Sequence, residues 1–539
     1  MNEYGYWILG LAVAYTAILI VLGNVVKRKA VSAEGFWVGG RSFKPWMVGV
    51  CITGLFSGST FIAVMELSYI KGVSAAWYGV AEMTHILIIA ALLGLFHKKM
   101  KVTVSGLIGE HFGRVALGLG GAITAFTFPM FSVATTLAFA SAISAFTSLP
   151  LTVTVTISAV LLLVYLQAGG MWSVVVTQTA NSVVFLAMFL VGLFALFIKP
   201  GLAGFMDFAA QRPEMFDPTN VGLQIIIAWF ATFFINILLA QACLQMTLSC
   251  RTVEEGRKGL LMAVGGNIIF VVLGVAFGVA AAIVVPGGAR GMIQVPLYLA
   301  QVLPAPLVGV FFLGVWACAL GWGAPCQFSG ATSLGRDVMG AVNPAASDEK
   351  KVFYTKISLV ALTIIMIGFS LLRSDQAAWW NILGWTLRNG ATFAPVVAAL
   401  FWPMATARAA IAAMAFGFIG GLTWYYLGDW HPAKFFMNIH PAFPGMTVNI
   451  LTMIAFCLIE QAGKWQIGGK NISSLKKNIG IAGGLVSVGT LLYSSMNFAL
   501  LTKMGLLGLS LFAIATGLFV MVVTLVVMRE EKNTAKKIV

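Results

Sequence analysis

Hydrophobic residues follow one another along this chain in fifteen long stretches, separated by short polar segments. Most stretches are about 20 to 27 residues long, which suits helices that cross a hydrocarbon layer roughly 30 Å thick. The pattern therefore predicts an all-α integral membrane protein. The predicted spans are residues 5–26, 45–70, 73–97, 115–146, 150–168, 171–199, 223–249, 257–286, 305–335, 351–372, 378–402, 406–427, 443–462, 479–501 and 505–528.

Composition excludes a water-soluble enzyme. Hydrophobic residues make up 60% of the chain, charged residues only 9%, and the mean hydropathy is +0.94. A soluble fold would leave most of these side chains without a core to enter. The polar segments between the spans are too short to fold as separate domains, and no GxxxxGK[ST] nucleotide-binding motif occurs. We therefore expect one transmembrane domain that does not hydrolyse ATP.

The basic residues predict how the chain is oriented. If the N-terminus lies outside, 25 of the 33 Lys and Arg residues fall in inner loops, as the positive-inside rule requires. The C-terminus is then cytoplasmic, and we expect the cell's inner membrane. The net charge of +15 thus reflects topology, with anionic lipids as partners and no nucleic-acid partner. The first stretch lacks a basic flank before it, so we expect it to be retained as a helix.

The centre of the second span is unusual for a helix that faces lipid. Its sequence, TGLFSGST from Thr53 to Thr60, contains two glycines among four hydroxyl residues. One interpretation is an unwound helix, whose exposed carbonyls and half-helix ends bind a cation and a small solute. The alternative is close packing of small residues against a neighbouring helix. The residues favour the first interpretation and predict Ser57, Ser59 and Thr60 as solute-binding.

A second irregularity lies in the ninth span, at Gly321 to Pro325. Proline has no amide hydrogen and its ring displaces the carbonyl four residues earlier, so Pro325 should free the carbonyl oxygen of Gly321. A cation or water could satisfy that oxygen. A kink satisfied by the hydroxyl of Ser329 or by a neighbouring helix is an equal alternative.

Ionisable residues within spans are the third signal, because a central charge costs about 2.5 to 3.5 kcal/mol on insertion. Four such residues are Glu66, Glu82, His85 and Arg388. Glu82 and His85 are three residues apart and are candidates for proton coupling, and Glu82 is also a candidate for binding the solute. Arg388 could bind a substrate carboxylate, or it could form an ion pair with Glu82 or Glu66. Glu66 lies near the outer end of its span, where it could be hydrated.

Seven motifs occur in an order that resembles the sodium/solute symporter family, whose members transport sugars, proline, pantothenate, acetate and sialic acid. The resemblance covers most of the chain. The motifs are FWVGGRSFKPWMVG, GLIGEHFG, GGMWSVVVTQ, QACLQMTLSCRTVEEGRKGL, GATSLGRDV, NGATFAPVVAALFW and IHPAFPGMTVN.

The resemblance implies a leucine-transporter-like core of ten helices in two inverted five-helix repeats, at residues 45–402. Residues 1–44 would add one N-terminal helix with an inner loop, and residues 403–539 four C-terminal helices. Alternating access is the implied mechanism. No cofactor is implied beyond the coupling ion, Na+ or H+, and the oligomeric state is not predicted.

The resemblance also implies an ion site, with departures from the family pattern. Carbonyls of Thr53 and Phe56 would hold sodium, together with a hydroxyl pair in the ninth span. That pair falls on Gly321 and Trp322, which have no hydroxyl, and an acidic position of the sixth span falls on Gln178. Three alternatives follow: sodium bound by other groups such as the Gly321 carbonyl, proton coupling, or uncoupled transport.

The predicted function is secondary transport of a small polar solute. The position where sugar carriers have an asparagine is Ala240, beside Gln241, which weakens a sugar assignment. With Arg388, Gln241, Gln245 and Asn381 available, an organic acid or amino acid is favoured. Rival interpretations are a membrane module that senses a solute without transporting it, or an uncoupled facilitator. A membrane enzyme is disfavoured because the five histidines are scattered.

Overall fold

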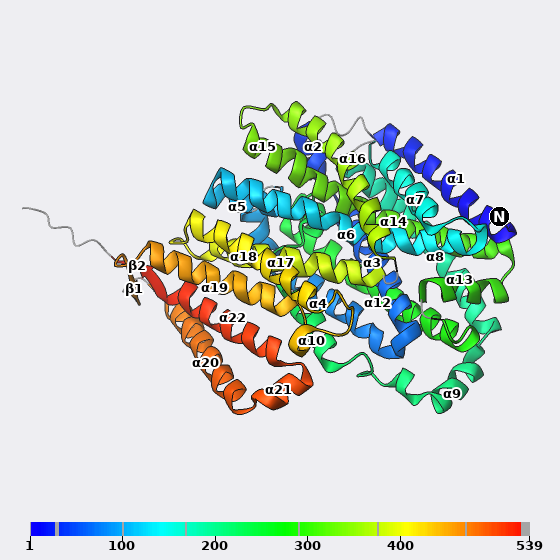
Figure 1. Ribbon diagram of the computed structural model, residues 1–539. Helices are drawn as coiled ribbons and strands as arrows, with labels where there is room; N and C mark the ends of the chain where they lie inside the picture. Colours follow the sequence, from blue (N-terminus) through cyan, green and yellow to red (C-terminus); the bar gives the residue numbers. More distant parts are fainter. Residues whose placement is uncertain are drawn as a thin grey trace, which may run out of the picture. The chain divides into compact units, whose positions relative to one another are not determined.

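The computed structural model describes residues 2–26, 32–99, 102–167, 170–288, 291–374, 377–468 and 472–529. Within these ranges the side chains of Ser57, Lys99 and Ala377 are not described. Helices dominate the structure (Figure 1), and the predicted all-α fold class is confirmed. A short antiparallel pair, β1 (Trp465–Ile467) and β2 (Val526–Met528), joins two helix ends.

The helices are α1 (Glu3–Val26), α2 (Ala33–Val38), α3 (Pro45–Lys71), α4 (Ala76–Lys99), α5 (Val104–Phe112), α6 (Arg114–Thr147), α7 (Leu151–Leu166), α8 (Gly170–Ile198), α9 (Gly201–Gln211), α10 (Leu223–Asn236), α11 (Gln241–Thr247), α12 (Val253–Val284), α13 (Gly291–Val302), α14 (Ala305–Thr332), α15 (Met339–Val342), α16 (Asp348–Leu372), α17 (Ala377–Phe401), α18 (Ala407–Leu427), α19 (Ala442–Glu460), α20 (Ser474–Met496), α21 (Phe498–Met504) and α22 (Leu507–Leu525).

Each of the fifteen predicted spans overlaps at least one of these helices, and the span at residues 223–249 contains both α10 and α11. Within the described residues, 11 helices are long and apolar enough to cross a membrane, or up to 12 if α10 and α11, bent by 47°, form one broken span. This number treats α3 and α4 as one run and leaves out α7, which has 16 residues, and α17, which is not among these apolar spans. Hydropathy found the helices because each one satisfies most of its backbone internally.

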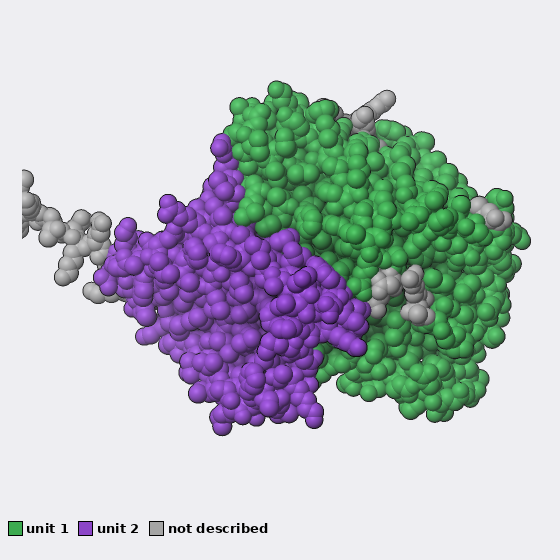
Figure 2. Space-filling model, in the orientation of Figure 1, with its two compact units in different colours: residues 1–107, 117–388 green, residues 108–116, 389–539 purple. Residues whose placement is uncertain are grey.

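The chain divides into two compact units (Figure 2). Unit 1 comprises residues 1–107 and 117–388, and unit 2 comprises residues 108–116 and 389–539. The division falls within the sequences of α5, α6 and α17. In unit 1, α3 packs along α12 and also contacts α8 and α14. In unit 2, α18 packs on α19, and α20 lies beside α22.

The predicted unwinding of the second span is wrong, because α3 is helical throughout Pro45–Lys71. Its glycines serve close packing instead. A Cβ on Gly58 would lie 2.5 Å from the carbonyl oxygen of Cys318, and a Cβ on Gly321 would lie 2.5 Å from that of Gly54. Real side chains do not fit such gaps, so glycine lets α3 and α14 approach backbone to backbone. The small-residue alternative describes this contact correctly.

Helix α14 also stays wound through Pro325 and continues into one π-helical turn at Ser333–Val338. The proline removes one donor without ending the helix, since the buried surroundings of α14 supply other partners. Gly321 to Pro325 therefore do not break the helix, and of the two alternatives given for this segment the structure agrees with the one in which a neighbouring helix satisfies the Gly321 carbonyl.

Unit 2 contains a related arrangement at Pro395 of α17. The carbonyl oxygen of Ala391, four residues earlier, accepts a hydrogen bond from Nδ2 of Asn449 at 2.7 Å. The same Nδ2 donates to the Ala413 carbonyl at 2.8 Å, while Oδ1 accepts from the Ala394 amide at 2.8 Å. One buried amide on α19 thus links α17 and α18 and satisfies the carbonyl that proline leaves without a donor.

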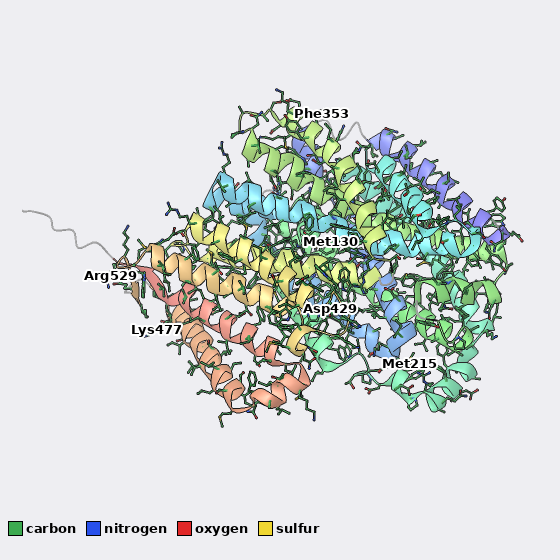
Figure 3. All side chains as sticks on the ribbon, in the orientation of Figure 1. Met130, Met215, Phe353, Asp429, Lys477 and Arg529 are labelled. Atoms are coloured by element: carbon green, nitrogen blue, oxygen red, sulfur yellow. The ribbon has the colours of Figure 1, made fainter. Side chains whose placement is uncertain are left out.

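The side chains of the helices differ in how exposed they are, and Figure 3 labels examples. Met130 on α6 is buried, while Phe353 on α16 is exposed. Lys477 lies in the first turn of α20, and Arg529 directly follows β2. Exposed apolar residues on α8 include Val183, Leu186, Leu190, Phe194 and Phe197. A multi-pass membrane protein presents such surfaces to lipid.

Replacing Asn449 by leucine should destabilise the protein by about 1 to 2 kcal/mol, because the Ala391 and Ala413 carbonyls lose their donor in a dry environment. Thermal unfolding in detergent measures this change. Val448→Ala, at a neighbouring exposed position, is the control and should unfold near the wild-type temperature. Equal melting temperatures for Asn449→Leu and the control would contradict the assignment.

Candidate functional site

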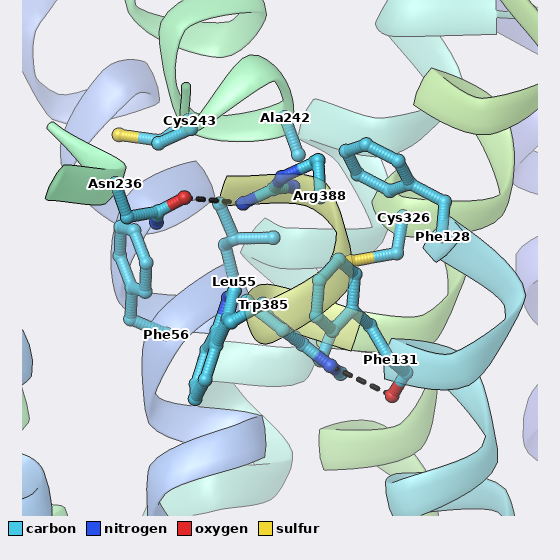
Figure 4. Close-up of a pocket in the computed structure, with 12 residues that line it drawn as sticks. Leu55, Phe56, Phe128, Phe131, Asn236, Ala242, Cys243, Cys326, Trp385 and Arg388 are labelled. Carbon is cyan, nitrogen blue, oxygen red and sulfur yellow. Dashed lines mark hydrogen bonds between the residues drawn. The ribbon is translucent and has the colours of Figure 1, made fainter. Parts of the chain in front are cut away.

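A cavity of about 20 Å³ lies within unit 1. This volume holds about one water molecule, so side chains must move before a solute can enter. Residues of α3, α6, α10, α14 and α17 line it, together with the α10–α11 connection and the start of α11 (Figure 4). They are Leu55, Phe56, Phe128, Phe131, Asn236, Ala240, Ala242, Cys243, Trp322, Cys326, Trp385 and Arg388.

Arg388 supplies the charge of the cavity and is only 4% exposed. Its Nη2 donates to Oδ1 of Asn236, the last residue of α10 (Figure 4). The guanidinium carbon also lies 5.2 Å from the ring centre of Phe128 and 5.0 Å from that of Phe131. Aromatic faces stabilise a desolvated guanidinium by up to about 2 kcal/mol each. Asn236, Phe128 and Phe131 thus contact the cation through groups that carry no charge.

Aromatic rings form the rest of the wall. The indole Nε1 of Trp322 donates to the Phe131 carbonyl at 2.8 Å, which fixes its ring. The ring centre of Trp385 lies 5.7 Å from that of Phe131 and 4.6 Å from that of Phe233. Such a wall suits the apolar part of a solute, whereas Arg388 and Asn236 suit a polar group.

A second polar cluster joins α3, α4 and α17. Nδ2 of Asn381 donates to the Ser59 hydroxyl at 2.8 Å and approaches the Tyr78 hydroxyl at 3.5 Å. Thr60 is buried next to Ser59, and its hydroxyl has no hydrogen-bond partner among the described residues. The side chain of Ser57 lies outside the described residues, so its predicted role remains a prediction.

Glu82 is fully buried on α4, one turn after Tyr78. Neither of its carboxylate oxygens has a hydrogen-bond partner among the described residues. The alternative in which Glu82 neutralises Arg388 therefore does not describe this structure. His85 follows on the same helix, and its Nε2 lies 3.5 Å from Nδ2 of Asn236. His85 thus adjoins the residue that holds Arg388.

Glu66 is buried rather than hydrated. It is 2% exposed, and its Oε2 accepts a hydrogen bond from the Ala378 amide at 3.1 Å. The sequence placed it near a span end, but the start of α17 covers it in the folded chain. Thr53 packs against Gly266 of α12, and Phe56 lines the cavity.

The amide of Gln241 connects helices outside the cavity. Its Nε2 donates to the Ser329 carbonyl at 3.0 Å and to the Ser333 hydroxyl at 2.9 Å, and its Oε1 accepts from the Val104 amide at 3.2 Å. Gln245 likewise bonds Ser329 and Trp37. Both side chains have structural partners here, although the neighbours Ala240, Ala242 and Cys243 line the cavity.

The carbonyl of Gly321 has a protein partner. Nε2 of Gln178 on α8 donates to it at 2.8 Å, so a neighbouring helix satisfies the oxygen that Pro325 releases. Two residues predicted as ion ligands, Gln178 and Gly321, therefore bind each other.

Sequence reasoning missed several cavity residues, above all Asn236, Phe131 and Trp385. The sequence predicts residues 223–249 as one span, so it does not predict the break after α10, which directly follows the buried cavity residue Asn236. A polar residue inside the apolar run FFINILLA was the available signal. Phe128 and Phe131 lie on either side of Pro129, a proline inside α6.

Solved structures resemble this fold. A Na+-coupled sialic acid symporter, in a substrate-bound outward-open state, superposes with a TM-score of 0.69 at 18% identity, covering 85% of this chain and 98% of that one. A nucleobase-cation-symport-1 family transporter, in a closed conformation with bromovinylhydantoin bound, gives 0.52 at 12% identity, covering 79% and 95%. The predicted leucine-transporter-like fold is therefore confirmed.

Sequence relatives agree with the fold. A sodium/glucose cotransporter of Vibrio parahaemolyticus is 25% identical over 442 residues, which cover 74% of this chain and 81% of the relative. The profile of the sodium:solute symporter family matches residues 36–417. These proteins are transporters and not enzymes. The chain belongs to the sodium:solute symporter family.

Proposed function

We propose that this protein is a secondary transporter that moves a small organic acid or amino acid by alternating access. The observation that carries the proposal is Arg388, buried in a membrane-embedded cavity among neutral and aromatic groups. A solute carboxylate would form two parallel hydrogen bonds with the guanidinium, a stronger arrangement than the bond to the Asn236 amide. The apolar part of the solute would then contact Trp385 and Phe131.

Arg388→Gln should reduce uptake of the carboxylate solute at least tenfold, because an amide cannot compensate the carboxylate charge in a dry cavity. Arg388→Lys should retain part of the uptake with a raised KM, since a lysine keeps the charge but not the planar fork. Uptake into proteoliposomes across a panel of small carboxylates and their amides measures both. Arg408→Gln, at an exposed arginine, is the matched control. Wild-type uptake by Arg388→Gln would exclude the proposed role.

For the coupling ion, we propose a proton that binds Glu82. An ionised carboxylate without a hydrogen-bond partner is costly in a dry interior, and a bound proton removes that cost. Glu82 lies on α4 three residues before His85, whose Nε2 lies 3.5 Å from Nδ2 of the cavity residue Asn236. Protonation of Glu82 would thus change the electrostatic environment close to the solute cavity.

Glu82→Gln should abolish concentrative uptake driven by a proton gradient, because glutamine mimics the protonated acid and cannot release the proton. Exchange of labelled for unlabelled solute should persist, since exchange needs no net proton movement. Glu254→Gln, at an exposed position, is the control. Undiminished concentrative uptake by Glu82→Gln would remove Glu82 from coupling.

An uncoupled facilitator is the second candidate. The observation that favours it is the bond between Gln178 and Gly321, which leaves this carbonyl with a neutral partner. Uptake that equilibrates the solute but never concentrates it, under sodium and proton gradients alike, would support the facilitator.

The proposed location is the inner membrane, with the N-terminus outside and the C-terminus in the cytoplasm, because of the distribution of Lys and Arg along the chain.

A further inference from the structure

Three helices of unit 1 meet through an unbroken series of hydrogen bonds. The Tyr15 hydroxyl on α1 donates to Oδ1 of Asn181 on α8 at 2.7 Å. Nδ2 of Asn181 donates to Oε1 of Gln178 at 3.2 Å and to the Ala317 carbonyl on α14 at 3.1 Å. Nε2 of Gln178 completes the series at the Gly321 carbonyl. Every member is buried and electrically neutral.

Helix α3 closes the junction from the opposite side. A Cβ on Gly54 would lie 1.9 Å from Oε1 of Gln178, so only glycine at this position leaves room for the amide. The Gly54 carbonyl oxygen in turn would lie 2.5 Å from a Cβ on Gly321. The Gln178 amide therefore occupies the space between the backbones of α3 and α14.

We propose that the Gln178 amide takes the place of a cation at this junction, so that the junction closes without sodium. An N–H group presents the positive end of a dipole to a carbonyl oxygen, as a cation does, but carries no net charge. A sodium ion here would need the Gly321 oxygen and would lie against the amide N–H of Gln178, whose positive partial charge already points to that oxygen and would repel the ion. The side chain at position 178 thus determines whether the junction needs a sodium ion.

This inference deepens the proposed function, because it states that solute transport does not require sodium. It is tested without any solute, so its failure is separate from a failure of the proposed carboxylate transport. The readout is the melting temperature of purified full-length protein, in sodium chloride and in choline chloride of equal concentration.

The wild type should melt at the same temperature in both salts. Gln178→Glu replaces the N–H donor by a second anionic oxygen that faces the Gly321 carbonyl. Its melting temperature should therefore rise saturably with sodium and not with choline, because a ligand that binds the folded state stabilises it by mass action. Gln211→Glu, at an exposed position on α9, is the matched control and should show no sodium-specific rise.

A saturable, sodium-specific rise in the wild type would overturn the proposal, and this measurement needs no variant to fold. A Gln178→Glu protein that folds but ignores sodium would also overturn it. Gly54→Ala adds an independent check. The added methyl group displaces the Gln178 amide and should lower the melting temperature in both salts equally.

Discussion

A peptide carbonyl that loses its donor at an intrahelical proline must find another donor within the protein when lipid surrounds the helix. This chain meets the requirement twice with a side-chain amide from a neighbouring helix. Gln178 serves the carbonyl released by Pro325, and Asn449 serves the one released by Pro395. Each amide also binds further groups, so helix continuity and helix packing depend on the same side chains.

The continuity of α3 and α14 explains where sequence reasoning succeeded and failed. Apolar length predicted every span, because a helix satisfies its own backbone and needs no knowledge of its neighbours. Glycine and hydroxyl residues near Gly54 predicted unwinding, but glycine permits both a broken helix and a close crossing. Only the position of α14 distinguishes the two, and sequence spacing carries no information about it. The released Gly321 carbonyl was predictable, while its partner Gln178 was not.

The cavity residues lead to the same conclusion. Arg388 can be recognised as a site residue from the sequence, because a charge within an apolar span is costly. Asn236 and Phe131 can be recognised only from their contacts with Arg388 in the structure. The polar residues of the core thus divide by their partners. Gln178, Asn181 and Gln241 are engaged with backbone and side chains of adjacent helices, while Glu82 lies buried without a hydrogen bond among the described residues. Structural amides and a titratable acid coexist within one core.

The connection between α10 and α11 bears on how a cavity of this size could enlarge. Ala240 has φ −72° and ψ 63°, the geometry of an inverse γ-turn, and the Gln241 amide donates to the Leu239 carbonyl at 2.7 Å. These torsions of Ala240 contribute to the 47° bend that separates α10 from α11. Rotation about them would move Cys243 relative to Asn236, and would change the volume of the cavity without breaking hydrogen bonds inside either helix.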